Sequence, residues 1–254
     1  MRAASALFIG PLLTGCLGDF NLFTVAEDRE LGLELAAEIQ ANPQDYPILD
    51  ESRYPEAYVH LYRMRSEILD NADLNYRDDF DWEMWIIEDD DVLNAFAAPG
   101  GYIWIYSGLI KYLDEEDDLA GVMAHEIAHA DQRHSTQQLT KQYGIYTLLD
   151  ILLGDDQGTI SDIAAGLATL EFSREDEAEA DEFSVNYLCE THYAADGAAN
   201  FFAKIGSSGI PEFLSTHPDP DNRVEDIRAW ADELGCDTSI YEAGQYDEFK
   251  ASLP

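Results

Sequence analysis

Strand-like sequence is confined to one short block of this chain. Three segments, residues 83–88, 92–97 and 101–106, have the β-branched and aromatic content of strands. In the third segment two isoleucines alternate with three aromatic residues, the period of a strand with two different faces. After residue 112 the pattern is helical almost to the end, and no linker divides the chain. The sequence therefore predicts an α+β domain that is mostly helical and contains a small three-stranded sheet.

Two helices are predicted ahead of that block from local signals. Thr24 and Glu27 have the spacing of a capping box at the start of a helix that continues to about Ala41. Pro55 suits the first turn of a second helix, which runs to about Asn71. Both helices therefore precede the sheet along the chain.

The charge of the chain excludes some classes of partner. Fourteen Lys and Arg stand against 52 Asp and Glu, which gives a net charge of −38 at pH 7. Such a surface repels phosphate, so we expect no nucleic-acid partner and no attraction to anionic lipid. The acidic residues either keep the protein soluble or adapt it to saline water, where about 1 M salt shortens the Debye length to about 3 Å. The sequence leaves both interpretations open.

Residues 1–15 have the layout of a secretory signal peptide. One Arg precedes an apolar stretch too short to span a bilayer, and small residues follow it. The stretch ends in Leu13-Thr14-Gly15-Cys16, which resembles the lipobox of bacterial lipoproteins. That resemblance implies a lipidated Cys16 and a bacterial cell-envelope protein on the periplasmic face, and Leu17 favours the outer membrane. The alternative is an ordinary signal peptide with an incidental cysteine.

The strongest chemical signal lies in residues 119–134. They contain the HExxH pattern His125-Glu126-Ile127-Ala128-His129 within an apolar stretch at helical spacing. Asp117 or Asp118 is suited to cap the start of this helix.

The spacing of this motif has a direct chemical meaning. His125 and His129 are four residues apart, so they lie on one face of a helix and can bind the same Zn²⁺. Glu126 lies about 100° further around the helix, where it can take a proton from a water molecule that the zinc activates. The alternative is that both histidines are solvated or packed in the core and bind no metal. A third ligand elsewhere in the chain would argue against that alternative.

That third ligand must come from later in the chain, because a zinc hydrolase uses three protein ligands and one open position. Residues 171–188 consist of good helix formers and carry several acidic residues. The acidic candidates are Glu171, Glu175, Asp176, Glu177, Glu179, Asp181 and Glu182. Spacing alone cannot choose among them.

HExxH followed by a later Ser-Arg-x-x-Glu-x-x-Ala-Asp, here residues 173–181, resembles the HtpX-like and CAAX-prenyl-protease-like zinc metallopeptidases. This is a gluzincin family, and the resemblance covers roughly residues 25–232. It implies a zincin-like (minigluzincin) fold and one zinc ion per chain. It also implies that His125, His129 and Glu177 are the ligands. Together with the lipobox, the chain is most similar to the periplasmic lipoprotein branch of this family.

The same resemblance suggests further roles. It implies that Asp181 orients a zinc-binding imidazole. Residues 94–109 resemble the family's strand before the zinc helix, at whose edge gluzincins receive an extended substrate. Residues 215–223 resemble the family's His-Pro…Arg segment, in which His217 approaches the metal and Arg223 stabilises the oxyanion. Each of these roles has an alternative. Residues 94–109 could contain a strand that only packs, Asp181 could be a solvated charge, and His217 and Arg223 could order a loop.

The function that the resemblance implies is a zinc endopeptidase with Glu126 as general base. Its expected partners are polypeptides, the unfolded or misfolded proteins of the envelope, and it reaches the membrane through its N-terminal lipid. The alternative is a non-hydrolytic periplasmic chaperone or assembly lipoprotein whose zinc site is latent, closed by His217. We divide the chain into a signal peptide (1–15), a lipidated cysteine and tether (16–24), a zinc metallopeptidase domain (25–235) and a C-terminal tail (236–254).

Some features stay open. Cys189 and Cys236 could form a disulfide in an exported protein, although Cys189 also has CxxH spacing to His192. Residues 144–170 are either a helical hairpin packed on the core, or a cover over the cleft or a contact surface. Three histidines match no motif and are expected on the surface or in packing: His60, His134 and His192.

Overall fold

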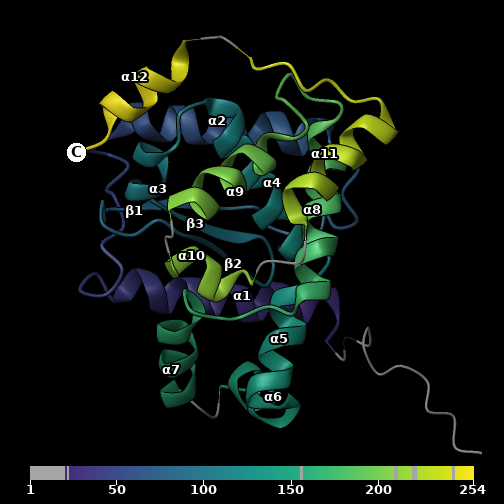
Figure 1. Ribbon diagram of the computed structural model, residues 1–254. Coiled ribbons are helices and arrows are strands. Elements are labelled where there is room, and N and C mark those ends of the chain that lie inside the picture. Colours follow the sequence, from purple (N-terminus) through teal and green to yellow (C-terminus); the bar gives the residue numbers. More distant parts are fainter. Residues whose placement is uncertain (1–20, 22, 155–156, 209–210, 219–221, 242–243) are drawn as a thin grey trace, which may run out of the picture.

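The computed structural model describes residues 21, 23–154, 157–208, 211–218, 222–241 and 244–254 (Figure 1). In chain order its elements are α1 (Val25–Ala41), α2 (Pro55–Asn71), β1 (Met84–Ile87), β2 (Ala95–Ala98), β3 (Tyr102–Tyr106), α3 (Ser107–Tyr112), α4 (Glu116–Asp131), α5 (His134–Tyr143), α6 (Ile145–Leu152), α7 (Gln157–Leu167), α8 (Arg174–Leu188), α9 (Gly197–Ser208), α10 (Pro211–Thr216), α11 (Arg223–Leu234) and α12 (Gln245–Ser252). The predicted α+β class, mostly helical with a small sheet, is confirmed. In the described parts of the chain, no helix has both the length and the apolar character that crossing a bilayer requires.

The first two helices begin where their local signals predict. The Thr24 side chain accepts a hydrogen bond from the Glu27 amide at 3.2 Å, and the Glu27 carboxylate accepts one from the Thr24 amide at 2.7 Å. This capping box is confirmed, and α1 ends at Ala41. Pro55 occupies the first turn of α2, where its missing N–H leaves no hydrogen bond unmade.

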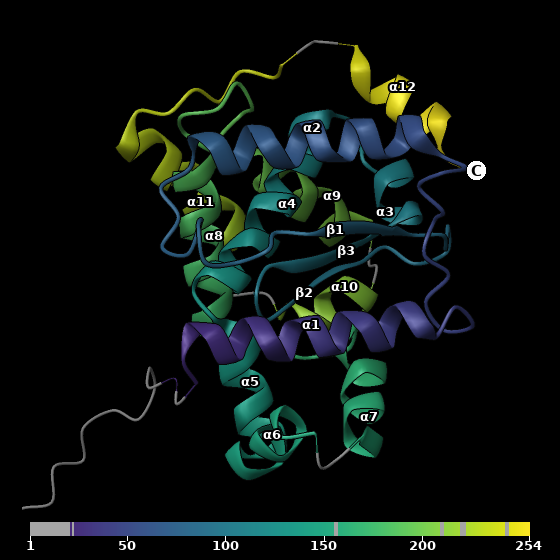
Figure 2. The same ribbon diagram turned by 180° about the vertical axis from the view of Figure 1, so that it is seen from behind.

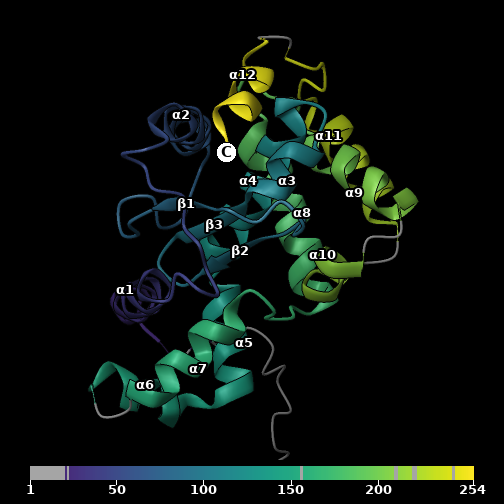
Figure 3. The same ribbon diagram turned by 90° about the vertical axis from the view of Figure 1, so that its left-hand side faces the viewer.

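The sheet has the strand order β1-β3-β2. β1 pairs with β3 in parallel, and β2 pairs with β3 antiparallel, with Phe96 opposite Trp104. The strand directly before the HExxH helix, β3, is therefore central, so it does not supply the edge that the resemblance implies for residues 94–109. Within residues 94–109 the edge strand is β2, which lies next to α4 (Figure 3).

The two faces of the sheet belong to two separate cores. Ile103 and Ile105 of β3 pack in the core that contains α2 and α4, and Trp104 packs on the opposite side with α1. Helices α2 and α1 accordingly lie on opposite sides of the sheet (Figure 2). The period-2 alternation predicted for β3 is thus confirmed, and it decides which helix each side chain meets.

Helices α5, α6 and α7 project beyond α1 (Figure 1). α6 and α7 form a hairpin against α1, and the Tyr46 hydroxyl donates to the Ala164 carbonyl at 3.1 Å. The interpretation of residues 144–170 as a packed helical hairpin agrees with this arrangement. Tyr146 in the first turn of α6 and Leu153 just after its end are largely exposed.

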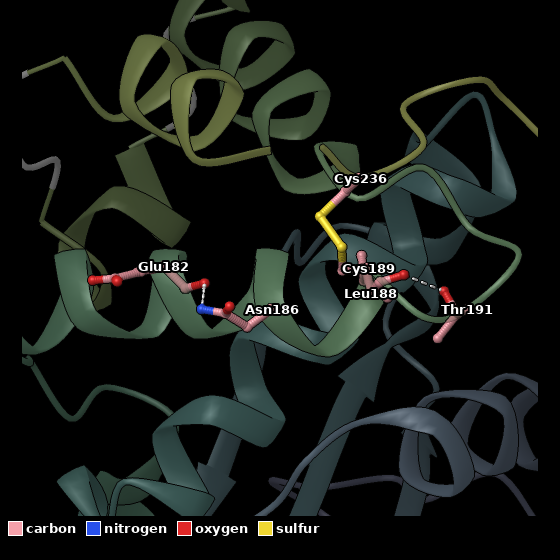
Figure 4. The surroundings of a disulfide bond; sticks show 6 residues. All are labelled: Glu182, Asn186, Leu188, Cys189, Thr191 and Cys236. Carbon is pink, nitrogen blue, oxygen red and sulfur yellow. Dashed lines mark hydrogen bonds between the residues drawn. A yellow bond between two sulfur atoms is a disulfide. The ribbon is translucent and has the colours of Figure 1, made fainter. Parts of the chain in front are cut away.

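The segment after residue 235 is attached to the body at two points. Cys236 forms a disulfide with Cys189, which joins the end of α11 to the end of α8 (Figure 4). Cys189 is thus bonded to Cys236, and the CxxH alternative with His192 does not hold. Further on, α12 packs against α2 and contributes Tyr246 and Phe249 to the core. This C-terminal segment is therefore packed, although we expected a tail.

Candidate metal centre

Helix α4 carries the HExxH motif through the centre of the molecule. It begins at Glu116 with Glu115 as its N-cap, so the expectation that Asp117 or Asp118 caps it is wrong. Asp118 instead accepts from the Glu115 amide at 3.3 Å, as the third residue of a capping box. Asp117 is turned to the Ala194 amide, at 2.6 Å, and ties α4 to a later loop.

Three predicted ligands converge at one point. The Nε2 atoms of His125 and His129 lie 3.0 Å apart. The Glu177 carboxylate brings one oxygen 3.4 Å from His125 Nε2 and the other 3.3 Å from His129 Nε2. Two imidazole nitrogens bound to one tetrahedral zinc at about 2.0–2.1 Å would be separated by about 3.3 Å. The spacing of these donors therefore fits a zinc ion.

Helix α8 places Glu177 by a local signal at its start. Ser173 is the N-cap, and its side chain accepts from the Asp176 amide at 3.1 Å, while Asp176 accepts from the Ser173 amide at 3.1 Å. This capping box places Glu177 in the first helical turn, pointing to α4. Although burial opposes its charge, His217, His125 and His129 hold the pKa of the Glu177 carboxyl well below its usual range.

His217, just after α10, is the fourth member of this group. Its Nδ1 lies 3.0 Å from Glu177, and its Nε2 lies 3.5 Å from Glu126. One ligand atom from each of His125, His129, Glu177 and His217 lies within 4.8 Å of the others, and the described residues contain no second group of this kind. The structure thus brings His217 to the position from which it could contact a metal ion.

Glu126 is buried beside this group and makes no strong contact of its own. Neither of its carboxylate oxygens has a hydrogen-bond partner among the described residues, and His217 Nε2 lies at 3.5 Å. Burial raises the pKa of Glu126 above the usual carboxyl value. An unpaired carboxylate with a raised pKa is suited to accept a proton.

Arg223 and Asp181 form a second layer around the ligands. The Arg223 guanidinium donates to both oxygens of Asp181, at 2.7 Å each, and to Glu177 at 2.9 Å. It also stacks over the Phe202 ring, 3.4 Å from the ring centre. Its Nη1 is buried and has no partner within the described part of the chain. Arg223 therefore braces the ligand helix and retains one donor.

The two motif histidines differ in their protonation behaviour. His125 Nδ1 lies 3.0 Å from Asp181. Burial opposes a charge on His125, but the contacts with Asp181 and Glu177 outweigh it and raise its pKa to about 9. At His129 burial prevails and lowers the pKa well below the usual value. Metal binding requires both Nε2 atoms to be free of protons.

His134 also belongs to this centre, although no motif indicates it. It is buried, and its Nδ1 lies 3.0 Å from His129 Nδ1. Five residues along a continuous helix would place it about 140° away from His129. Only the break between α4 and α5 brings the two rings together. His60, stacked on Phe249, and His192, paired with Glu67, have the packing roles expected of them.

The centre is enclosed by aromatic rings. Phe172 stacks on His129 with ring centres 4.0 Å apart, and Phe213 stacks on His217 at 4.3 Å. A backbone hydrogen bond of 3.2 Å from Phe172 to Thr216 joins these two segments. The side chains of the four clustered residues are at most 1% exposed. Cys16 and the predicted signal peptide lie outside the described residues.

Comparison with known proteins gives one family match and relatives of two kinds. The sequence profile of peptidase family M48 matches residues 55–231. The beta-barrel assembly-enhancing protease of Yersinia pestis is 33% identical over 57% of this chain and 33% of its own length. Its counterpart in Escherichia coli K12 is 32% identical over 60% of this chain and 35% of its own length. The mitochondrial metalloendopeptidase OMA1 of Saccharomyces cerevisiae is 30% identical over 69% of this chain and 55% of its own length. The chain thus spans between a third and about half of these relatives.

Proposed function

Because the chain belongs to peptidase family M48, we propose that it is a zinc-dependent endopeptidase. In this proposal His125, His129 and Glu177 hold one zinc ion, and Glu126 is the general base. The observation that carries it is the convergence of three buried donors beside an unpaired buried carboxylate. The names of the relatives, a protease and a metalloendopeptidase, support the same activity.

The chemistry divides among a few groups. When bound, zinc supplies Lewis acidity, which polarises the scissile carbonyl and makes water a stronger acid. Glu126 takes the proton of the attacking water and then delivers it to the leaving amine. The unpaired Nη1 of Arg223 is available to the oxyanion that forms on the substrate. Asp181, whose carboxylate lies 3.0 Å from Nδ1 of His125, orients that ring.

The edge strand β2 is the proposed docking site for the substrate backbone. It is an edge of the sheet, and it lies beside α4, which carries the base. Strand addition uses main-chain hydrogen bonds and therefore needs an extended, unfolded segment. We propose that the substrates are unfolded or misfolded polypeptides.

The resting site is closed in this proposal. His217 lies between Glu177 and Glu126, in the space that a substrate carbonyl would need. The rings of Phe213 and Phe172 pack against it, with ring centres 4.3 Å and 5.7 Å from that of His217. Substrate access then requires the segment that carries His217 to move away, and hydrolysis is slow until it does.

We assign the protein to the bacterial cell envelope. The name of the Yersinia pestis relative, a beta-barrel assembly-enhancing protease, supports this location. The lipobox at Leu13–Cys16 supports a lipid anchor on the periplasmic face of the outer membrane. In a bacterial host, Cys16→Ala should abolish labelling with radioactive palmitate and release the protein from membranes. Labelling that persists in this variant would refute the anchor.

Metal content and hydrolysis together test the catalytic assignment. Wild type should bind about one zinc per chain, and Glu177→Gln should lose it. Glu182→Gln is the matched control, because Glu182 is an exposed carboxylate on the same helix. Glu126→Gln should keep zinc and lose at least about 100-fold in the rate of hydrolysis, the contribution of a general base. Substantial cleavage by Glu126→Gln would refute its role.

The substrate class needs a separate experiment. One disulfide-bonded protein is offered in its folded form and in a reduced, alkylated, unfolded form. The unfolded form should be cut and the folded form spared, since only an extended chain can add to β2. His217→Ala should cut the unfolded form faster than wild type. Equal cleavage of both forms would refute the proposed substrate class.

A further inference from the structure

The turn between α4 and α5 has an unusual backbone. Arg133 has φ of 63°, the left-handed region that non-glycine residues rarely adopt. The surrounding structure holds it there, because its guanidinium donates to Asp28 and to the Phe23 carbonyl. The reversal ends α4 and starts α5 with His134 folded back towards the HExxH face.

His134 forms a chain of contacts that ends at a metal ligand. On one side its Nε2 lies 3.2 Å from the Glu179 carboxylate of α8. On the other side its Nδ1 lies 3.0 Å from His129 Nδ1. The His134 side chain is 2% exposed, whereas the Glu179 side chain is half exposed. The chain thus runs from the surface through His134 to His129.

Counting protons along this chain leaves one favourable arrangement. A carboxylate only accepts, so His134 carries a proton on Nε2, and in the neutral ring its Nδ1 is then an acceptor. His129 must therefore donate from its Nδ1, which leaves His129 Nε2 free of a proton and facing His125 and Glu177. In the opposite tautomer of His129, two bare Nδ1 atoms would face each other at 3.0 Å and repel.

We propose that His134, held by Glu179, is a positioning residue that selects the metal-binding tautomer of His129 and fixes the orientation of its ring. It does for His129 what Asp181 does for His125, whose Nδ1 lies 3.0 Å from that carboxylate. The inference rests on the proposed function, since it assumes that His129 is a zinc ligand. Partners of this kind strengthen metal affinity about 10–100-fold.

Two substitutions of similar shape separate hydrogen bonding from packing. His134→Leu places a methyl group where Nδ1 was, so the acceptor is lost. His134→Asn places a carbonyl oxygen there, so the acceptor is kept. His192→Leu is the control, because His192 contacts Glu67 at 2.9 Å and is not part of the metal group. Zinc affinity is measured by competition with a chelator, and folding by circular dichroism.

The proposal expects a split between the two variants. His134→Leu should bind zinc about 10-fold or more weakly, and His134→Asn should stay within about threefold of wild type. In the zinc-loaded wild type, ¹⁵N ring shifts should show the His134 proton on Nε2. Equal affinities for the two variants, or a His134 proton on Nδ1, would overturn the inference. Failure of wild type itself to bind zinc would instead refute the proposed function.

Discussion

The Cys189–Cys236 disulfide should contribute a large part of the stability of this protein. Its cysteines are separated by 47 residues in the sequence. Chain-entropy arguments give about 14 cal/mol/K for closing a loop of that length in the unfolded state, or about 4 kcal/mol at 25 °C. A change of 1 kcal/mol shifts the melting temperature of a protein this size by about 2–4 °C. We therefore expect loss of the disulfide to lower it by about 8–16 °C.

The native state should change little when the disulfide is lost. The Leu188 carbonyl accepts from the Thr191 hydroxyl at 2.7 Å, so the end of α8 keeps its own hydrogen bond (Figure 4). At the opposite ends of the same two helices, Arg223 of α11 still holds Glu177 and Asp181 of α8. Zinc affinity should therefore change by much less than the about 10–100-fold that loss of a ligand's partner causes.

The assay is guanidinium unfolding of three zinc-saturated samples. These are oxidised wild type, wild type with a phosphine reductant, and the double variant Cys189→Ala/Cys236→Ala. The last two should agree, because both lack the cross-link, and both should lie about 4 kcal/mol below oxidised wild type. A difference below about 1 kcal/mol would refute the entropic reasoning. Loss of zinc affinity together with stability would show that the cross-link shapes the native site.

Three further predictions concern packing, pH and salt. Gly121→Ala would push a methyl group into the backbone of Gly197 and Ala198 where α4 crosses α9, and should cost about 1–3 kcal/mol in thermal melts. Gly206→Ala adds a Cβ in open space, so it should be neutral or stabilising. A larger loss of stability in Gly206→Ala than in Gly121→Ala would refute this packing. Burial raises the pKa of Asp118 to about 6 from about 4 unfolded, so its contribution to stability is lost as pH rises from about 4 through about 6. Asp118→Asn should flatten that part of the stability profile, and an unchanged slope would contradict it. The protein has a net charge of −38, and salt screens the repulsion among its acidic residues. Its melting temperature should therefore rise as NaCl increases from about 0.1 to 1 M, and a fall would exclude adaptation to saline water.

Several features of this protein follow from residues within one or two turns of one another. The capping box at Thr24 and Glu27, and the first-turn Pro55, locate α1 and α2, because caps depend only on nearby backbone groups. The alternation in β3 indicates its two faces, since the side-chain period of a strand is two. The spacing of His125 and His129 places both rings on one helix face, because residues four apart lie about one turn from each other in a helix.

Other features depend on contacts between distant residues, and no local pattern contains them. Strand order decides that β2, and not β3, is the edge. Seven acidic residues lie within residues 171–182, and only the packing of α8 on α4 brings Glu177 to the histidines. The pairing of Cys189 with Cys236 requires α8 and α11 to end side by side.

His134 is the clearest case of the second kind. Helical periodicity places it away from His129, and the left-handed Arg133 reverses that placement. The strain at Arg133 is sustained by Asp28, more than 100 residues earlier in the chain. The sequence by itself thus determines the starts of α1 and α2, the alternation of β3 and the two-histidine motif. The tertiary structure alone decides which carboxylates and histidines meet that motif, because those contacts join segments far apart in the chain.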